Sequence, residues 1–313
     1  MIISASRRTD LPARYSEWLA NRFSERYVYA RNPVSVHQVS RINLSPEVVD
    51  GIVFWTKNPE PMLDKMGVFS DYPYYFQITV NPYGLDVEPN IPSKNDAIIP
   101  AVRRLSEMIG PNRIIWRYDP ILLNKKYTLE YHYEYFERMA KKLSGYVRRC
   151  TFSFIDLYKN TERNVQPLAI KKLTTEDMLA IAKQFSQIAG SFGLRLDTCA
   201  EAIDLHEYGI GHACCIDREI FEDLTGFHIK AVKDSNQRPE CGCIASIDIG
   251  MYNTCTNGCR YCYANSNATR ARRGCAEHDP KAPLLIGKVT DEDKLTDRKM
   301  VSFKHAQFDL LGQ

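Results

Sequence analysis

Residues 2–10 read Ile-Ile-Ser-Ala-Ser-Arg-Arg-Thr-Asp, a short apolar run that passes directly into charged and polar residues. The run at 2–6 has the length and β-branched content of a buried strand. The same succession of an apolar run and polar residues recurs along the chain. Predicted strands lie at 2–6, 52–56, 74–80, 113–118, 150–156, 194–198 and 244–249. Amphipathic segments between them predict helices at 12–25, 95–109, 129–144, 174–192 and 217–225.

Strands that alternate with helices predict an α/β fold built from parallel βα units. A full or partial (β/α) barrel is the economical way to close such a sheet, although a doubly wound open sheet has the same alternation. The barrel is favoured because polar residues follow nearly every predicted strand. In a barrel the carboxyl ends of all strands meet at one face, where active sites lie.

The candidate catalytic residues are the charged side chains at these strand ends. They are Arg7, Asp10, Lys57, Arg117, Asp119 and Glu201. The basic members suit binding of carboxylate or phosphate, and the acidic members suit proton transfer. A structural ion pair at the barrel mouth is the alternative role for each. Tyr83, Tyr118 and Tyr158 are candidates for ring stacking or hydrogen relay.

The composition is ordinary for a globular protein, with 313 residues, 44% hydrophobic, 25% charged and a net charge of +3. This balance demands neither nucleic acid nor an anionic membrane as partner. The apolar runs are too short to span a membrane, and the N-terminus lacks a signal-peptide pattern, so we expect a cytoplasmic protein. Ten cysteines, nine of them from Cys199 onward, are many for a reducing compartment and indicate metal or redox chemistry.

Three of these cysteines, Cys255, Cys259 and Cys262, are spaced C-x3-C-x2-C directly after the predicted strand at 244–249. Three thiolates on one short loop can bind three corners of a cubane cluster, which usually takes four cysteines. One iron then stays open to another ligand. A zinc site that takes Cys259 and Cys262 with ligands from elsewhere is the alternative, and a coincidental spacing is the third interpretation.

The loop resembles the signature of the radical S-adenosylmethionine superfamily, in which an aromatic residue, here Tyr261, precedes the third cysteine. Its extended form, Cys-Arg-Tyr-Cys-Tyr-Ala-Asn at 259–265, is similar to the spore photoproduct lyase branch. The resemblance implies a [4Fe–4S] cluster whose open iron binds S-adenosylmethionine, and a reductant such as flavodoxin or ferredoxin. It implies cleavage of that cofactor to methionine and a 5′-deoxyadenosyl radical. It also implies that Tyr261, Asn253 and Tyr263 bind the cofactor.

The substrate implied by the resemblance is a small molecule or, through the branch, a nucleic-acid lesion. Arg270, Arg272 and Arg273 form a small basic run that suits phosphate contacts. A solvated helix face is the ordinary explanation of such a run. Nucleic acid is therefore the minority hypothesis.

More of the chain resembles an uncharacterised microbial family of unknown function, over residues 1 to about 290. The resemblance is carried by Ile-Ser-Ala-Ser-Arg-Arg-Thr-Asp at 3–10, Phe-Trp-Thr-Lys-Asn-Pro at 54–59, Trp-Arg-Tyr-Asp-Pro at 116–120 and the three-cysteine loop. It supplies no substrate.

The position of the cysteine loop departs from the superfamily pattern. In that pattern the loop usually follows the first strand, whereas here it follows the last predicted strand, and no Gly-Gly-Glu run is present. A circularly permuted barrel reconciles the two orders, with the strand at 244–249 as strand one and the strand at 2–6 beside it. A non-catalytic iron–sulfur protein for electron transfer or redox sensing, and a zinc-stabilised binding module, stay open as other classes.

A second set of cysteines is a candidate for an auxiliary iron–sulfur cluster. Its members are Cys199, Cys215, Cys241 and Cys243. Free cysteines are also common as small buried hydrophobic residues, which is the alternative. In domain terms, residues 1–265 are expected to form the barrel with the cluster loop at 250–265. Residues 266–313 are expected to form a peripheral helix and a C-terminal tail.

Overall fold

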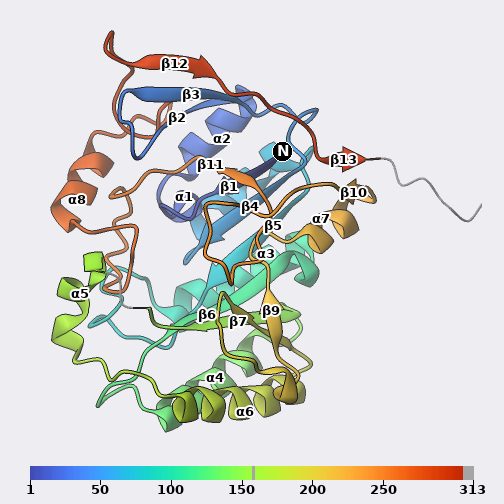
Figure 1. Cartoon of the computed structure of the whole chain (residues 1–313), viewed down its shortest axis with the longest axis vertical. Helices are drawn as coiled ribbons and strands as arrows, with labels where there is room; N and C mark the ends of the chain where they lie inside the picture. The colour runs from blue at the N-terminus through green and yellow to red at the C-terminus, as the bar shows by residue number, and fades with distance from the viewer. Residues whose placement is uncertain (157–158, 306–313) are drawn as a thin grey trace, which may run out of the picture.

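The computed structural model describes residues 1–156 and 159–305, so the predicted role of Tyr158 lies outside the described residues. Its centre is an eight-stranded sheet in the order β11-β1-β4-β5-β6-β7-β8-β9 (Figure 1). Every pair of neighbouring strands in this sheet is parallel. The strands are β1 (Ile2–Ala5), β4 (Gly51–Thr56), β5 (Tyr74–Thr79), β6 (Ile114–Ile121), β7 (Arg149–Phe154), β8 (Arg195–Cys199), β9 (Gly211–Ala213) and β11 (Ser246–Asp248).

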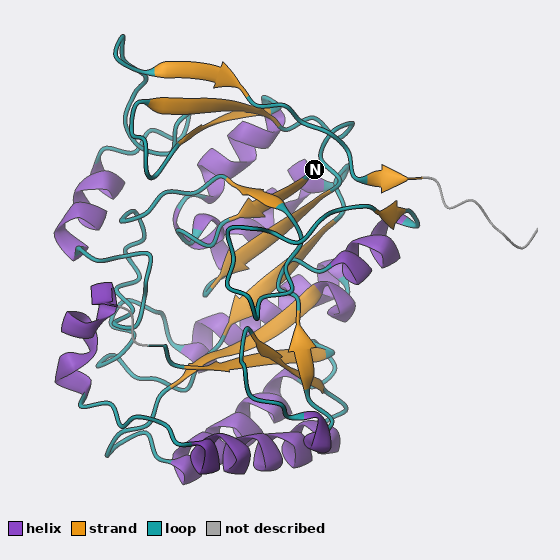
Figure 2. Cartoon of the chain, viewed as in Figure 1, coloured by secondary structure: helices purple, strands orange, loops and turns teal. Residues whose placement is uncertain are grey.

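The helices lie mainly on the outer side of this curved sheet (Figure 2). They are α1 (Leu11–Arg14), α2 (Ser16–Ser24), α3 (Ile99–Ile109), α4 (Leu129–Leu143), α5 (Lys159–Val165), α6 (Thr175–Ser191), α7 (Arg218–Thr225) and α8 (Ala268–Ala276). Two predicted helices differ in detail. The one at 12–25 is divided at Tyr15 into α1 and α2, and the one at 95–109 begins with a π-helical turn at Lys94–Ile98. The α/β alternation predicted from the sequence is confirmed.

The start of α6 illustrates how local sequence sets an element. The Thr174 side chain accepts a hydrogen bond from the backbone N–H of Asp177 at 3.2 Å, and the Asp177 carboxylate accepts one from the Thr174 N–H at 3.0 Å. This reciprocal capping box satisfies two helix-terminal donors that would otherwise lack partners. The helix therefore begins where the sequence predicted it.

Alternate strand residues face two different environments, as a pleated strand requires. Ile3, Phe54 and Phe76 pack in the large core beneath the helices. Their neighbours Val53 and Tyr75 belong to a smaller cluster on the inner face of the sheet. Further along each strand the inner positions become polar, so the inner face near the carboxyl ends of the strands can hold charged groups.

The two edge strands, β9 and β11, are not joined by a strand ladder within residues 1–156 and 159–305. The irregular segments next to them do meet, since the Ile244 N–H donates to the Ile216 carbonyl at 3.2 Å. The fold is therefore an α/β fold with a parallel sheet flanked by helices, and closure into a full barrel is not shown. As predicted, the strand near 244–249 pairs in parallel with the strand at 2–6, with Ile3 opposite Ile247.

The C-terminal region adds to the periphery. After α8, the strand β12 (Lys294–Asp297) joins β3 (Gln38–Asn43) and β2 (Tyr27–Arg31) in a three-stranded sheet. The strands β10 (His228–Ile229) and β13 (Lys304–His305) form a two-stranded sheet. The expected tail thus contains paired strands as far as 305, and residues 306–313 lie outside the described part. No helix among the described residues is both long and apolar enough to span a membrane.

Candidate functional site

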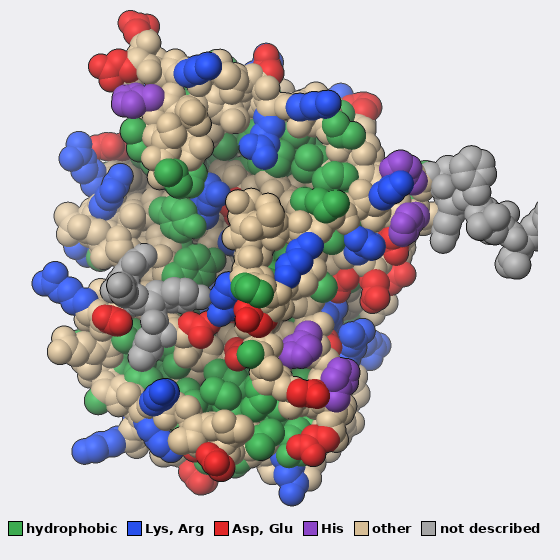
Figure 3. All heavy atoms as spheres, in the orientation of Figure 1, with side chains coloured by type: hydrophobic (Ala, Val, Ile, Leu, Met, Phe, Trp, Pro, Cys, Tyr) green, Lys and Arg blue, Asp and Glu red, His purple; other side chains and the backbone are tan. Residues whose placement is uncertain are grey.

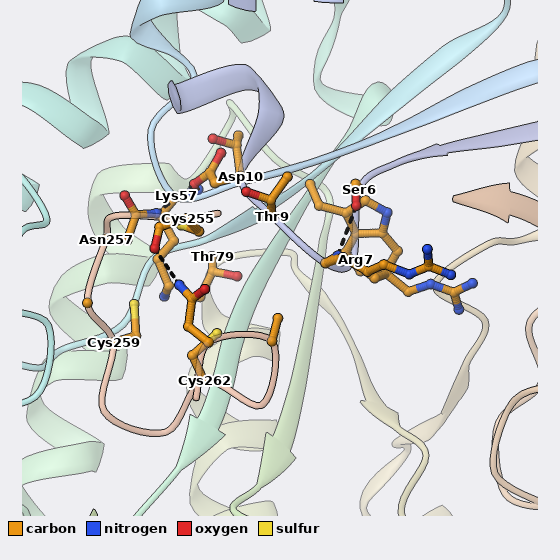
Figure 4. A pocket seen from close by; sticks show the side chains of 16 residues that line it. Ser6, Arg7, Thr9, Asp10, Lys57, Thr79, Cys255, Asn257, Cys259 and Cys262 are labelled. Atoms are coloured by element: carbon orange, nitrogen blue, oxygen red, sulfur yellow. Dashed lines mark hydrogen bonds between the residues drawn. The ribbon is translucent and has the colours of Figure 1, made fainter. Parts of the chain in front are cut away.

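A cavity of about 140 Å³ lies at the carboxyl ends of β1 and β4 and is open to solvent. Cys255, Cys259 and Cys262 all line it (Figure 4). The figure shows these three residues on one side and Arg7 on the other. The cavity volume equals that of roughly five liquid waters at about 30 Å³ each. The structure thus brings the three loop cysteines to one cavity, at the end of the sheet where the strand exits converge.

Hydrogen bonds from α1 and the residues on either side of it fix the loop that carries these cysteines. The Asn257 amide donates to Asp10 Oδ2 at 2.9 Å, and Arg14 Nε donates to Asn257 Oδ1 at 2.7 Å. The Tyr15 hydroxyl donates to the Thr254 carbonyl at 2.6 Å. Because these contacts span more than 230 positions in sequence, the loop geometry is a property of the fold rather than of the loop alone.

Gly258 allows the loop to turn against a neighbouring segment. Its φ is +72°, a left-handed conformation that side chains other than glycine rarely adopt. A Cβ there would lie 3.0 Å from Asn90 Nδ2 and 3.1 Å from Pro89 Cγ. Close approach and backbone conformation therefore both favour glycine between the first two cysteines.

A buried charged group lies behind the loop. Lys57 Nζ donates to Glu88 Oε1 at 2.8 Å and to the Tyr261 hydroxyl at 2.7 Å, and Lys94 Nζ lies 2.7 Å from Glu88 Oε2. Burial alone would raise the pKa of Glu88, but Lys57 and Lys94 outweigh it and lower that pKa to about 2. Burial would lower the pKa of Lys57, yet the Glu88 carboxylate raises it above its usual value. Both partners are therefore charged at neutral pH.

The three loop thiols are protonated when no metal is bound. Burial raises the pKa of Cys255 to about 12 and raises those of Cys259 and Cys262. The Lys57 ammonium opposes this rise at Cys259 and Cys262. A metal must displace these protons to bind, and the nearby positive charge favours the thiolates that result.

Three buried polar atoms of residues that line the cavity have no hydrogen-bond partner in the described part of the chain. They are Thr9 Oγ1, Trp55 Nε1 and Asn265 Oδ1. A buried polar atom without a partner costs free energy comparable to a lost hydrogen bond. The three residues line the cavity, whereas these particular atoms are themselves closed off from solvent.

The spacing of the thiols bears on which metal group fits. No group of three or more His, Cys, Asp or Glu side chains within residues 1–156 and 159–305 is arranged to hold a single metal ion. A zinc site draws its sulfurs to about 2.3 Å from one point, whereas a cubane is bound at its corners by thiolates that stand further apart. Cys255, Cys259 and Cys262 line one cavity, and which metal group they bind stays a prediction.

The predicted catalytic residues at β1 and β4 are in the site, but their roles differ. Asp10 is buried and accepts hydrogen bonds from the Lys57 N–H at 2.9 Å and the Ala13 N–H at 3.1 Å. Burial raises its pKa. These contacts tie β1, β4 and the cysteine loop together, which is a positioning role. Arg7 lines the cavity and donates to Asp234 Oδ2 at 3.3 Å.

Arg117 and Asp119 pair with each other and lie away from the loop cavity. Arg117 Nε donates to Asp119 Oδ2 at 2.9 Å, and Arg117 Nη1 donates to Cys215 Sγ at 2.9 Å. The Ser153 hydroxyl also donates to Asp119. The expected anion clamp is therefore occupied by partners within the chain.

Glu201 is a separate ionisable group at the end of β8. Its Oε1 accepts a hydrogen bond from the Phe154 N–H at 2.8 Å. Burial raises its pKa to about 7, and Asp156 and Asp119 add to this rise. It can exchange a proton near neutral pH, although it does not line the loop cavity.

The three residues predicted to bind the cofactor do not line the cavity. Tyr261 donates to Glu88 behind the loop. The side chain of Asn253 accepts from the N–H groups of Ser266 at 2.9 Å and Asn267 at 3.2 Å, just before α8. The Tyr263 hydroxyl donates to the Arg7 carbonyl at 2.9 Å. In this arrangement all three support the loop.

Sequence reasoning missed several members of the site. Glu88, Trp55, Thr9 and Asn265 carry no motif spacing of their own, although Thr9, Trp55 and Asn265 lie inside the quoted stretches at 3–10, 54–59 and 259–265. Glu88 is separated by 31 positions from Lys57. Its near-complete burial, at 1% exposed, is visible only in the fold.

The basic run on α8 is exposed, and Arg273 Nε pairs with Glu277 at 2.8 Å one helical turn away. On the face drawn in Figure 3, basic and acidic side chains are interspersed. This distribution agrees with the modest net charge and supplies no specific support for a nucleic-acid surface.

The second predicted set of cysteines is also brought together. Cys199, Cys215, Cys241 and Cys243 share the inner cluster of the sheet. Cys199 Sγ lies 3.0 Å from Cys215 Sγ. This group is distinct from the loop cysteines, which lie at the cavity.

Comparison with known families places the chain in one of them. Residues 2–264 match the model of a family described as a domain of unknown function, DUF1848. The chain belongs to this family. No curated protein matches the chain. The family description assigns no activity, so radical chemistry stays a prediction from the cysteine loop.

Proposed function

We propose that this DUF1848 protein is a radical S-adenosylmethionine enzyme whose cluster is held by Cys255, Cys259 and Cys262. The observation that carries the proposal is that these three cysteines all line one open cavity at the carboxyl ends of β1 and β4. When bound, a [4Fe–4S] cluster with S-adenosylmethionine would supply reductive cleavage of the sulfonium to a carbon radical. A flavodoxin or ferredoxin is the expected class of electron donor.

The order of strands is consistent with a circularly permuted barrel. The loop follows β11, and β11 lies beside β1 in parallel. In this arrangement β11 takes the place of the first strand, and the chain's own N-terminal strand comes second. The proposal thereby accounts for a cysteine loop near the end of the chain.

The chain's own residues would bind and orient the cofactor in distinct ways. Lys57 stabilises the deprotonated loop cysteines, and Glu88 keeps that lysine charged and in place. Arg7 and Arg8 also line the cavity and bring positive charge to it, which suits a carboxylate.

The test is anaerobic reconstitution of the full chain with iron and sulfide, followed by electron paramagnetic resonance after reduction. We expect a [4Fe–4S]⁺ signal that changes when S-adenosylmethionine is added, and release of methionine and 5′-deoxyadenosine. The Cys255→Ala, Cys259→Ala, Cys262→Ala variant should lose both responses. Cys275→Ala, on α8 and outside both cysteine groups, is the matched control and should keep them.

Two other results would overturn the proposal. A loop cluster whose signal is indifferent to S-adenosylmethionine would assign the loop to electron transfer or redox sensing. Stoichiometric zinc in place of iron, lost in the same triple variant, would assign it to a structural metal site.

A further inference from the structure

Five cysteines gather in the seam between the two edge strands of the main sheet. Cys199 is the last residue of β8, Cys214 and Cys215 directly follow β9, and Cys241 and Cys243 precede β11. We call these five residues the seam cysteines. They come from three segments that meet only in the folded chain.

The seam thiols are in mutual contact. Cys199 Sγ and Cys215 Sγ are 3.0 Å apart, and Cys241 and Cys243 belong to the same cluster of packed side chains. Cys214 packs on the same turn, because a Cβ on Gly242 would lie 2.6 Å from Cys214 Sγ. The backbone between Cys241 and Cys243 must therefore lack a side chain for the sulfurs to gather.

The donors around these sulfurs favour thiolates over apolar packing. The Arg117 guanidinium, 5% exposed, points Nη1 at Cys215 Sγ at 2.9 Å. The Ile216 N–H donates to Cys243 Sγ at 3.3 Å. A buried cation and an amide donor directed at sulfur are the outer contacts that stabilise metal-bound thiolates. A cysteine that serves as a small hydrophobic residue needs neither.

A metal bound by the seam cysteines would have a structural role, because the seam lies between the edge strands β9 and β11. The segment after β9 is anchored on the inner face, since the Cys215 carbonyl accepts from the Tyr75 hydroxyl at 2.8 Å and from Gln77 Nε2 at 3.0 Å. The segment before β11 meets it through the hydrogen bond from Ile244 to Ile216 at 3.2 Å. Ligands from both segments would cross-link the two edges that no strand ladder joins within the described residues.

From this geometry we infer that Cys199, Cys215, Cys241 and Cys243 ligate a second metal centre, with thiolate ligands only, that closes the sheet. Four thiolates suit zinc or an iron–sulfur cluster, and both share this ligand chemistry. Since no group of three or more such side chains in the described part of the chain is already arranged to hold a single metal ion, the four thiols must shift when the metal binds. Binding replaces S–H···S contacts by sulfur–metal bonds, and the thiol protons leave to solvent. The inference uses none of the loop cysteines and is therefore independent of the proposed function.

The experiment uses the full-length Cys255→Ala, Cys259→Ala, Cys262→Ala variant, in which the loop cannot bind a cluster. It is isolated anaerobically, reconstituted with iron and sulfide or with zinc, and desalted before metal and sulfide are measured. We expect stoichiometric retained metal. Iron with sulfide would identify a cluster and zinc without sulfide a mononuclear site, and both support the inference. Cys275→Ala added to this background should change nothing.

Loss of metal in the same background with Cys215→Ser and Cys243→Ser would place the centre in the seam. Because those changes can impair folding, a second measurement uses the triple variant without them. Its native thiols are alkylated with and without bound metal and located by mass spectrometry. We expect the four seam ligands to be protected by metal, while Cys275 stays equally reactive. Absence of retained metal, or unchanged alkylation of the seam, would overturn the inference without affecting the loop proposal.

Discussion

The loop cysteines and the seam cysteines are brought together in two different ways. The loop places three within eight consecutive positions and turns them toward an open cavity. The seam draws five from a stretch of more than forty positions and buries most of them inside the sheet. The Lys57 ammonium, itself held by Glu88, opposes the rise in the pKa of two loop cysteines, whereas the Arg117 guanidinium donates directly to Cys215 of the seam.

The difference teaches where each site would act. A cavity open to solvent admits a cofactor and a substrate, which suits chemistry. A buried group between two strand edges admits a metal but little else, which suits stability. Hydrogen bonds nonetheless connect the two regions, because Asn81 accepts from the Asp119 N–H at 2.8 Å and donates to the Tyr261 hydroxyl at 3.0 Å.

The largest expected effect is on the stability of the fold, and it comes from metal bound by the seam cysteines and not by the loop cysteines. Removing metal from the seam with a chelator should lower the free energy of unfolding by about 4 kcal/mol, for a centre held at a thousand times its dissociation constant. The reason is that the metal binds only the folded seam. Thermal unfolding of the triple loop variant, with and without metal, measures it. If the melting temperature is unchanged, the seam has no structural role.

Glu88 tests the charged group behind the loop. Glu88→Gln leaves Lys57 and Lys94 without their shared carboxylate, and we expect a loss of about 3 kcal/mol in unfolding free energy at neutral pH. The folded-state pKa of about 2 lies below the ordinary 4.5, so this contribution is complete above pH 4.5 and disappears as pH falls toward 2. Urea unfolding across that range should show a steeper pH dependence for the unmodified chain.

The matched control is Glu134→Gln, which breaks the exposed pair with Arg138 on α4. Exposed pairs of this kind contribute only about 0.5 kcal/mol. Equal effects of the two substitutions would mean that the charged group behind the loop carries no special weight.

Lys57→Met should act on the loop and spare the seam. Removing the ammonium takes away the charge that favours the Cys259 and Cys262 thiolates, and we expect about tenfold weaker cluster binding by the loop. Titration of iron and sulfide, read from the signal that responds to S-adenosylmethionine, measures this change. Lys126→Met, at an exposed pair with Asp86, is the control. Equal loss of metal from both cysteine groups would refute a local role.

The smallest effect concerns Glu201, which follows the seam cysteine Cys199 by two positions and does not line the loop cavity. Its folded-state pKa of about 7 is above the ordinary 4.5, so its contribution is present below pH 4.5 and is lost as pH rises toward 7. Because the side chain is partly exposed, we expect about 1 kcal/mol. Glu201→Gln should flatten the stability profile between pH 5 and 8, followed by thermal unfolding. If Glu201→Gln leaves the pH profile of stability unchanged, ionisation of the Glu201 carboxylate does not destabilise the folded protein.

The sequence by itself determined the α/β alternation, because strand and helix patterns are local and repeat along the chain. It also determined the three loop cysteines, since their spacing is a local feature of one short stretch of sequence. The pairing of the strand near 244–249 with the strand at 2–6 was expected from the circularly permuted barrel. It named four seam cysteines, but only as one interpretation among others.

The tertiary structure alone decided what those residues contact. Glu88 between Lys57 and Lys94, Arg117 against Cys215, and Asn257 on Asp10 join positions tens to hundreds of residues apart. It also decided that Tyr261 and Asn253 support the loop instead of lining the cavity. Such partners are set by how the strands are ordered in the sheet. The order of the strands in the sheet cannot be predicted from residue spacing, because two residues that meet across the sheet can be separated by any number of positions in the sequence.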